Sequence, residues 1–260
     1  MTTQTLPATD HPLELQGRRA LVTGGSRGIG AAITRRLLAA GATVLTTARS
    51  ATADTPEGAE FVAADVRTPE AVAQLARTAV ERLGGVDILI NNAGAARVHA
   101  GGTPDIPASE WQDALDINFL SSVWLDAAVL PGMRERRSGA IVHISSTVVL
   151  DPTGPFLHYA AAKAALNTYS RGLALEQAPY GIRVNSVLPG NVTTPGADLA
   201  REHIAEAVGV TPDELVAGTP LGRIGQPDDI AEMVAFLVSD RASWTTGRTF
   251  TVDGGGFPQG

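Results

Sequence analysis

Apolar runs of strand length alternate along the chain with longer segments that have the periodicity of amphipathic helices. The strand-length runs lie at 19–24, 42–48, 60–66, 86–94, 139–146, 182–190 and 247–255. The helical segments begin at Ile29 and Pro69, continue with 111–133 and 156–178, and end with one that begins at Pro227. Strands that alternate with helices predict a parallel sheet covered on both faces. We therefore predict an α/β fold with a doubly wound sheet of seven parallel strands.

No shift in composition, linker or internal repeat divides the chain after its first residues. Residues 15–260 are therefore expected to form a single domain, and the polar segment 1–14 is expected to precede it as a flexible tail. That segment lacks the layout of a signal peptide. Residues 191–226 form a long insertion without a strand pattern. Because long loops in such places often hold ligands, we expect this insertion to cover the substrate.

Composition narrows the classes of partner. The 260 residues are 44% hydrophobic and carry a net charge of −7 without a long run of Lys or Arg, so nucleic acid is not an expected partner. The chain has no cysteine, which excludes disulfides and thiolate metal sites and favours the cytoplasm. No apolar stretch approaches the ~20 residues of a membrane span, so no membrane association is expected.

A glycine-rich turn, Thr23 to Gly30 ("TGGSRGIG"), joins the first predicted strand to the first helix. Glycines there allow the backbone to approach a pyrophosphate that faces the amino end of the helix. The spacing of Gly24, Gly28 and Gly30 differs from the usual G-x-G-x-x-G, so the general dinucleotide fingerprint is not satisfied as written. The position of the turn nevertheless predicts a dinucleotide site.

The choice of nicotinamide cofactor depends on charge at the end of the second strand. A 2′-phosphate requires cations, whereas a free ribose diol requires a carboxylate. Where that carboxylate would stand the chain has Ala48, followed by Arg49, and Arg27 lies within the glycine turn. We therefore predict NADP(H) rather than NAD(H); the alternative is that both arginines are solvated surface residues.

Tyr159 and Lys163 lie four residues apart in the alanine-rich sequence "YAAAK", on one face of a predicted helix. Taken alone, this pair could be a tyrosine at the edge of the core beside a solvated lysine. Further motifs change that interpretation. They are "NNAG" at 91–94, "IN" ending in Asn118, "ISS" at 144–146 and "VLPGNVTTP" at 187–195.

Together with the glycine turn, these motifs resemble the NADP-linked branch of the short-chain dehydrogenase/reductase family, over roughly residues 15–256, and in particular its members similar to 3-oxoacyl-carrier-protein reductases. The resemblance implies a Rossmann fold, a homo-oligomer (tetramer or dimer), and NADPH-dependent reduction of a carbonyl compound or oxidation of an alcohol. It also implies a catalytic tetrad, formed by Asn118, Ser146, Tyr159 and Lys163. Ser146 is preferred to Ser145 because it stands thirteen residues before the tyrosine, a common spacing in the family.

The chemistry of the tetrad follows from its side chains. A tyrosine has a pKa of about 10, and a nearby ammonium group such as Lys163 is expected to lower it. Tyr159 would then exchange a proton with the carbonyl oxygen, while Ser146 hydrogen-bonds the same oxygen. In the family the lysine also holds the nicotinamide ribose, and Asn118 places a water in a proton relay.

The resemblance implies further contacts with the cofactor, such as Asp65 accepting a hydrogen bond from the adenine amino group. The motifs "NNAG" and "LPGN" are also plausible as ordinary turns. The full set of predicted cofactor residues is Gly24, Ser26, Arg27, Gly28, Ile29, Gly30, Arg49, Asp65, Val66, Asn92, Ala93, Gly94, Tyr159, Lys163, Pro189, Gly190, Val192 and Thr194.

No metal site is predicted, because neither His143 nor His158 has the spacing to a second histidine or a carboxylate that a metal motif requires. The segments expected around the substrate, including Val148 to Phe156, are mostly apolar. They favour a neutral, fairly apolar ketone or secondary alcohol. Two alternatives remain: a cofactor-bound regulator without redox activity, and a scaffold for dehydration or epimerisation.

Overall fold

The computed structural model describes residues 13–211 and 218–257. Its centre is a seven-stranded sheet in the order β3-β2-β1-β4-β5-β6-β7, in which all neighbours are parallel. The strands are β1 (Arg19–Thr23), β2 (Thr43–Ala48), β3 (Glu60–Ala63), β4 (Ile88–Asn91), β5 (Gly139–Ile144), β6 (Ile182–Pro189) and β7 (Thr249–Val252). The predicted parallel sheet is confirmed, each strand lying within a predicted run.

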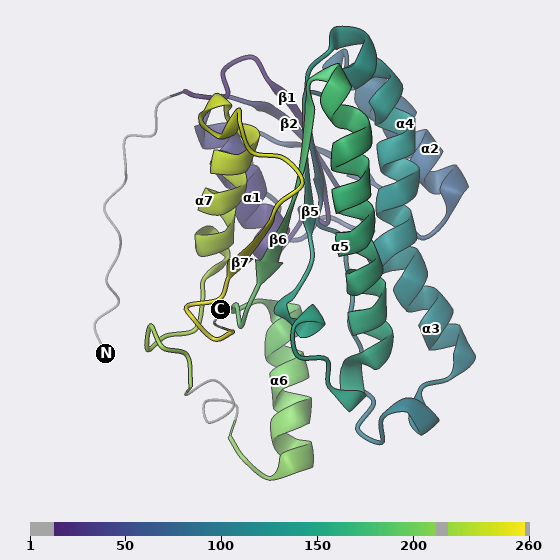
Figure 1. Cartoon of the computed structure of the whole chain (residues 1–260), viewed down its shortest axis with the longest axis vertical. Coiled ribbons are helices and arrows are strands. Elements are labelled where there is room, and N and C mark those ends of the chain that lie inside the picture. The colour runs from purple at the N-terminus through teal and green to yellow at the C-terminus, as the bar shows by residue number, and fades with distance from the viewer. Residues whose placement is uncertain (1–12, 212–217, 258–260) are drawn as a thin grey trace.

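Helices cover both faces of the sheet (Figure 1). On one face lie α1 (Gly28–Ala39) and α7 (Pro227–Val238), and on the other lie α2 (Pro69–Leu83), α4 (Ser121–Arg136) and α5 (Leu157–Gln177). Successive residues of β1 pack into the two hydrophobic cores on opposite faces of the sheet. Ala20 and Val22 pack on the α1 side, and Leu21 packs on the α2 side. Burial on both faces explains the continuously apolar strands and confirms a doubly wound Rossmann fold of one domain.

One long helical segment, Ala108–Arg136, combines α3 (Ala108–Leu115), a π-helical turn (η2, Asp116–Leu120) and α4. By length and composition it could cross a membrane, so the expectation that no apolar stretch approaches a membrane span is wrong for this segment. Half of its most apolar window (50%) is buried inside the protein, as in the core helix of a soluble protein. The π-helical turn carries Asn118; such turns often occur at functional sites.

The insertion 191–226 has no strand in its described residues, as predicted, but it contains a helix that the sequence pattern did not indicate, α6 (Pro195–Val208). Thr194 caps this helix by accepting a hydrogen bond from the Ala197 amide (3.1 Å). Figure 1 shows α6 beyond the carboxyl end of β6. Of the predicted tail 1–14, residues 1–12 lie outside the described part, and Glu14 forms an ion pair with Arg36 (3.0 Å).

Candidate active site

The glycine turn is held against the end of β4 by hydrogen bonds. The Thr23 hydroxyl accepts from the amides of Asn92 and Ala93 (3.0 Å each). The Asn92 side-chain amide donates to the carbonyl groups of Thr23 (2.9 Å) and Gly24 (3.2 Å). The side chain of Asn92, one of the predicted cofactor residues, therefore holds the turn in place.

Within this turn, two glycines have no room for a side chain. A Cβ atom on Gly25 would lie 1.8 Å from Thr46 Oγ1, and one on Gly30 would lie 2.2 Å from the Gly24 carbonyl oxygen. Gly24 and Gly28 adopt positive φ angles of 68° and 55°, a conformation that other residues rarely adopt. The unusual spacing of glycines therefore reflects close packing of the turn on β2 and α1.

Replacing Gly25 by alanine should lower the free energy of unfolding by about 1–3 kcal/mol, because the buried turn must shift to admit the methyl group. Urea unfolding measures this change. Gly172→Ala is the matched control: nothing lies within 4 Å of a Cβ at that position in α5, so the substitution should stabilise the protein by up to about 1 kcal/mol, because alanine is the better helix former. Equal destabilisation by both substitutions would contradict the packing argument.

A cavity of about 290 Å³ opens beside the turn, at the carboxyl ends of β1, β2 and β4. Thirteen of the predicted cofactor residues line it: Gly24, Ser26, Arg27, Gly28, Ile29, Gly30, Arg49, Asp65, Val66, Asn92, Ala93, Gly94 and Thr194. Five do not line it, namely Tyr159, Lys163, Pro189, Gly190 and Val192. The glycine backbone and the amino end of α1 fit the phosphates of a dinucleotide.

Two cations on the cavity wall are available to an anion. Arg27 and Arg49 are both exposed and pair with no carboxylate among the described residues. A third arginine on the cavity wall, Arg67, is not among the predicted cofactor residues. It forms ion pairs with Asp113 (2.6 Å) and Asp65 (3.2 Å). Asp65 therefore stands in the cavity as half of an ion pair. The structure also adds Thr47, Ala48, Ala64, Ala95, Ile117, Pro195 and Gly196 to the lining.

The four predicted catalytic residues come together next to this cavity. Asn118 Nδ2 donates to the Ala95 carbonyl (2.9 Å), and its Oδ1 accepts from the Ala95 amide (3.1 Å). This pair of bonds fixes the chain at Gly94, where an added Cβ would lie 2.9 Å from Asn118 Oδ1 and 3.4 Å from Lys163 Nζ. Asn118 and Lys163 thus face each other across a residue that must be glycine.

Two neighbouring serines have different partners. Ser146 lies near enough to the Tyr159 phenol to lower its pKa, and its hydroxyl accepts a hydrogen bond from the Val148 amide (3.3 Å). Ser145 is buried, and its hydroxyl donates to the Lys163 carbonyl (3.4 Å). Only Ser146 is directed toward the tyrosine, as expected from the two faces of the strand.

The expected effect of Lys163 on the tyrosine is wrong for this structure. Burial raises the pKa of the Tyr159 phenol, and the hydrogen bond with Ser146 only partly opposes this rise. Lys163 Nζ lies 5.8 Å from the centre of the Tyr159 ring and donates to the Ile144 carbonyl (2.8 Å). Its own pKa falls from 10.5 to about 7, because burial disfavours the charged ammonium. The lysine is therefore a weaker source of positive charge than its sequence position suggests.

The histidines have carboxylate partners that sequence spacing did not indicate. His143 is fully buried, with Nε2 3.0 Å from Asp126 Oδ2 and Nδ1 3.0 Å from Ser170 Oγ. His143 is therefore a histidine of the core. His158 lies in a separate cluster with His99 and Glu110. Burial, together with the charges of His99 and Arg97, holds the pKa of His158 below its usual value despite the opposing effect of Glu110.

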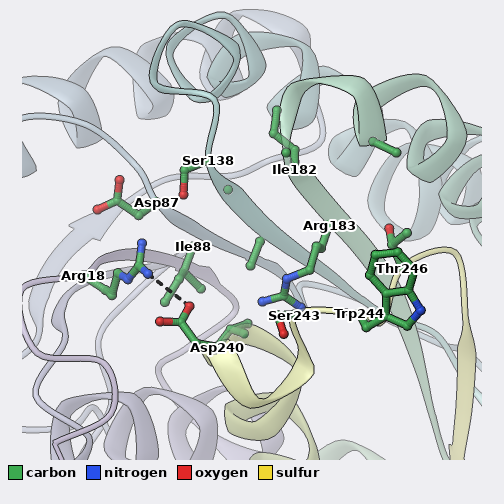
Figure 2. A pocket seen from close by; sticks show the side chains of 15 residues that line it. Arg18, Asp87, Ile88, Ser138, Ile182, Arg183, Asp240, Ser243, Trp244 and Thr246 are labelled. Atoms are coloured by element: carbon green, nitrogen blue, oxygen red, sulfur yellow. Dashed lines mark hydrogen bonds and ion pairs between the residues drawn. The ribbon is translucent and has the colours of Figure 1, made fainter.

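A second cavity, of about 500 Å³, lies at the opposite end of the sheet, where β4, β5 and β6 begin (Figure 2). Arg18 and Asp240 form an ion pair there (3.2 Å), and the Trp244 side chain is fully exposed. None of the predicted catalytic or cofactor residues lines this cavity. Parallel α/β sheets bind ligands at the carboxyl ends of their strands, so the smaller cavity is the candidate active site.

The chain is similar to known proteins along almost its whole length. Residues 24–256 match the family model described as Enoyl-(Acyl carrier protein) reductase. The chain is 36% identical to 3-oxoacyl-[acyl-carrier-protein] reductase FabG of Vibrio cholerae, over 94% of this chain and 98% of the relative. It is 38% identical to 3-alpha-(or 20-beta)-hydroxysteroid dehydrogenase of Mycobacterium tuberculosis, over 93% and 90%. The crystal structure of levodione reductase superposes with a TM-score of 0.85 at 31% identity, covering 92% of this chain and 97% of that one. The match along almost the whole length makes this chain a member of the short-chain dehydrogenase/reductase family of oxidoreductases.

Proposed function

We propose that this chain is an NADPH-dependent carbonyl reductase, able to run in reverse as an alcohol dehydrogenase. The observation that carries the proposal is the convergence of four side chains at the edge of the cofactor cavity: Ser146 and Lys163 lie beside Tyr159, and Asn118 and Lys163 meet at Gly94. A regulator without redox activity would not need this arrangement. Dehydration or epimerisation is disfavoured by the same intact set of four side chains.

Tyr159 is the proton donor of the proposed reaction. A phenol whose pKa is raised keeps its proton at neutral pH, which suits a general acid in the reducing direction. Ser146 donates a hydrogen bond to the same carbonyl oxygen and stabilises the negative charge that develops there. Bound nicotinamide supplies the hydride.

Lys163 and Asn118 have supporting roles. Lys163 holds the nicotinamide ribose, for which its buried position beside Gly94 is suited. Asn118 keeps that position open, because its two bonds to Ala95 fix the chain segment against which Lys163 lies. Asn118 Nδ2 is fully used by the carbonyl groups of Ala95 and Ala114, so only its Oδ1 is left to hold a water of a proton relay.

The proposed substrate is a neutral, fairly apolar ketone or the corresponding secondary alcohol. The segment Val148 to Phe156 supports this proposal because Asp151 is its only charged residue. The names of the relatives point to two such classes, oxoacyl thioesters and steroids. We also propose that the insertion 191–226 covers this substrate, since Thr194, Pro195 and Gly196 already line the cavity.

A turnover assay tests the proposed function. NADPH oxidation is followed with a panel that contains a 3-oxoacyl thioester, a 3-oxosteroid and a cyclic diketone. An enoyl thioester is added because the matched family model bears that name. We expect turnover with at least one ketone and none with the enoyl thioester. Activity on the enoyl thioester alone, or on no compound, would contradict carbonyl reduction.

Replacing Arg49 by alanine should raise the KM for NADPH by roughly ten- to a hundredfold, with a much smaller effect on the KM for NADH. A charge-assisted hydrogen bond to a phosphate contributes ~1.5–3 kcal/mol, which corresponds to that range. The difference should shrink as salt is added, because the site is exposed. Steady-state kinetics with both cofactors at two ionic strengths measures the effect.

Arg77→Ala is the control for this substitution, because Arg77 is an exposed arginine of α2 outside the cavity, and it should change neither KM. If the wild type prefers NADH, or if Arg49→Ala affects both cofactors equally, the NADP(H) assignment fails while the reductase proposal stands.

We further propose that the enzyme is a cytoplasmic homo-oligomer, a tetramer or dimer. Large apolar side chains on its surface support association of subunits, among them Leu175 (79% exposed) and Trp244 (100% exposed). The absence of cysteine is consistent with a reducing compartment.

A further inference from the structure

His99, Glu110 and His158 form a cluster of metal-ligating side chains beside the proposed active site. One ligand atom from each residue lies within 4.8 Å of the others. The three come from different elements: His99 from the segment between β4 and α3, Glu110 from α3, and His158 from α5, directly before Tyr159. They are separated by 11 and 48 residues along the chain, so no sequence motif could have indicated the cluster.

The buried ring nitrogens of this cluster lack partners. His158 is 2% exposed, and its Nδ1 atom has no hydrogen bond within the described part of the chain. The Nε2 atom of His99 is likewise buried and unbonded in those residues. An unpaired buried polar atom costs about 1–3 kcal/mol unless something satisfies it. Each of the two neighbouring histidines therefore has a ring nitrogen available to a ligand that accepts electron pairs.

The surroundings of the cluster hold the two histidines firmly. The rings of His99 and His158 meet edge to face, with centroids 5.2 Å apart, and Trp111 packs against His158 in the same manner (6.2 Å). The backbone amide of His99 donates to the Pro155 carbonyl (3.2 Å), which ties its segment to the start of α5. The positions of the two histidines are therefore fixed in part by contacts with Trp111 and Pro155, which lie outside the cluster.

We propose that His99, Glu110 and His158 bind a zinc ion, which links the segment after β4 and helix α3 to the start of α5. Two imidazoles and one carboxylate are a known zinc ligand set, with the fourth position taken by water. Tetrahedral ligands at zinc lie roughly 3.4 Å apart, so the side chains must close around the ion by small rotations. Glu110 is now paired with Arg97, whose side chain is 62% exposed. Glu110 itself is 16% exposed, and the long, solvent-exposed Arg97 side chain moves into water when the ion takes its place.

Zinc binding to the full chain tests the proposal directly. The purified protein is stripped with a chelator and titrated with ZnCl2 against a chromophoric competitor, with CoCl2 and MgCl2 in parallel. We expect one zinc per chain with micromolar or tighter affinity, cobalt absorption bands of a four-coordinate site, and no competition by magnesium. Saturating zinc should raise Tm by roughly 5–10 °C.

The variants His99→Gln and Glu110→Gln identify the ligands, and His203→Gln, an exposed histidine of α6, is the matched control. Loss of an outer hydrogen-bond partner alone weakens metal binding by ~10–100-fold, so loss of a ligand should weaken it at least as much. The control should bind as the wild type does. Wild-type zinc binding no tighter than that of the two ligand variants, or an equal loss in the control, would overturn the proposal. The cobalt spectrum of the wild type decides the question even if a variant fails to fold.

Discussion

Replacing Tyr159 by phenylalanine should lower kcat for ketone reduction by ~10²–10⁴-fold, because the substitution removes the only proton that the proposed mechanism delivers to the carbonyl oxygen. The ring itself stays in place, so the hydrophobic contacts of α5 are kept. The dissociation constant of NADPH should change little, since the phenol acts in proton transfer. Steady-state kinetics and a fluorescence titration with NADPH measure the two effects.

Tyr180→Phe is the matched control for this substitution. Tyr180 is a partly exposed tyrosine whose ring lies under the Arg134 guanidinium (4.7 Å), outside the active site. Its hydroxyl has no role in the proposed reaction, so the variant should retain wild-type kcat. If Tyr159→Phe keeps more than a tenth of the activity, Tyr159 is not the proton donor.

Replacing Lys163 by methionine should have two effects at once. It removes the group that holds the nicotinamide ribose, so NADPH binding should weaken by roughly ten- to a hundredfold, as expected for loss of a charged hydrogen bond. Because the ribose positions the nicotinamide, loss of this contact should also displace the hydride donor, so kcat should fall by ~10²-fold or more. Unchanged cofactor binding would show that Lys163 makes no contact with NADPH.

The charge state of Lys163 can be measured without interference, because it is the sole lysine of the chain. Protein labelled with 13C-lysine should give a single εCH2 signal that titrates near pH 7, in agreement with the lowered pKa, rather than near 10.5. Between pH 7 and pH 10.5 the folded chain binds fewer protons at Lys163 than the unfolded chain does. The free energy of unfolding therefore rises with pH in this range. From pH 7 to 9 the wild type should gain about 2 kcal/mol relative to Lys163→Met.

The sheet and its helices could be predicted from the sequence because burial on both faces makes the strands continuously apolar. In β1 each of Ala20, Leu21 and Val22 has a core to enter, and the pattern of the chain reflects this directly. Helix α6 was not predicted, because the insertion 191–226 was described only by its lack of a strand pattern and its helical pattern was not considered. The capping residue Thr194 followed by Pro195 was the available signal.

Site residues could be predicted where they are close together in the sequence or where they belong to a recognisable motif. Tyr159 and Lys163 share a helical face, and the glycine turn joins a strand to a helix. The direction of the Tyr159 pKa could not be predicted, because it depends on how deeply both side chains are buried. The cluster of His99 and His158 was missed for a similar reason: tertiary packing joins residues that no local spacing connects.

The most direct test of the central claim is hydride transfer itself. Wild-type protein is incubated with NADPH deuterated at C4 of the nicotinamide and with the ketone panel, and the products are examined by mass spectrometry. The proposal predicts an alcohol with one deuterium at the carbinol carbon, formed by the wild type and not by Tyr159→Phe. If no ketone receives deuterium, or if both proteins transfer it at equal rates, this arrangement of Ser146, Tyr159 and Lys163 does not catalyse carbonyl reduction.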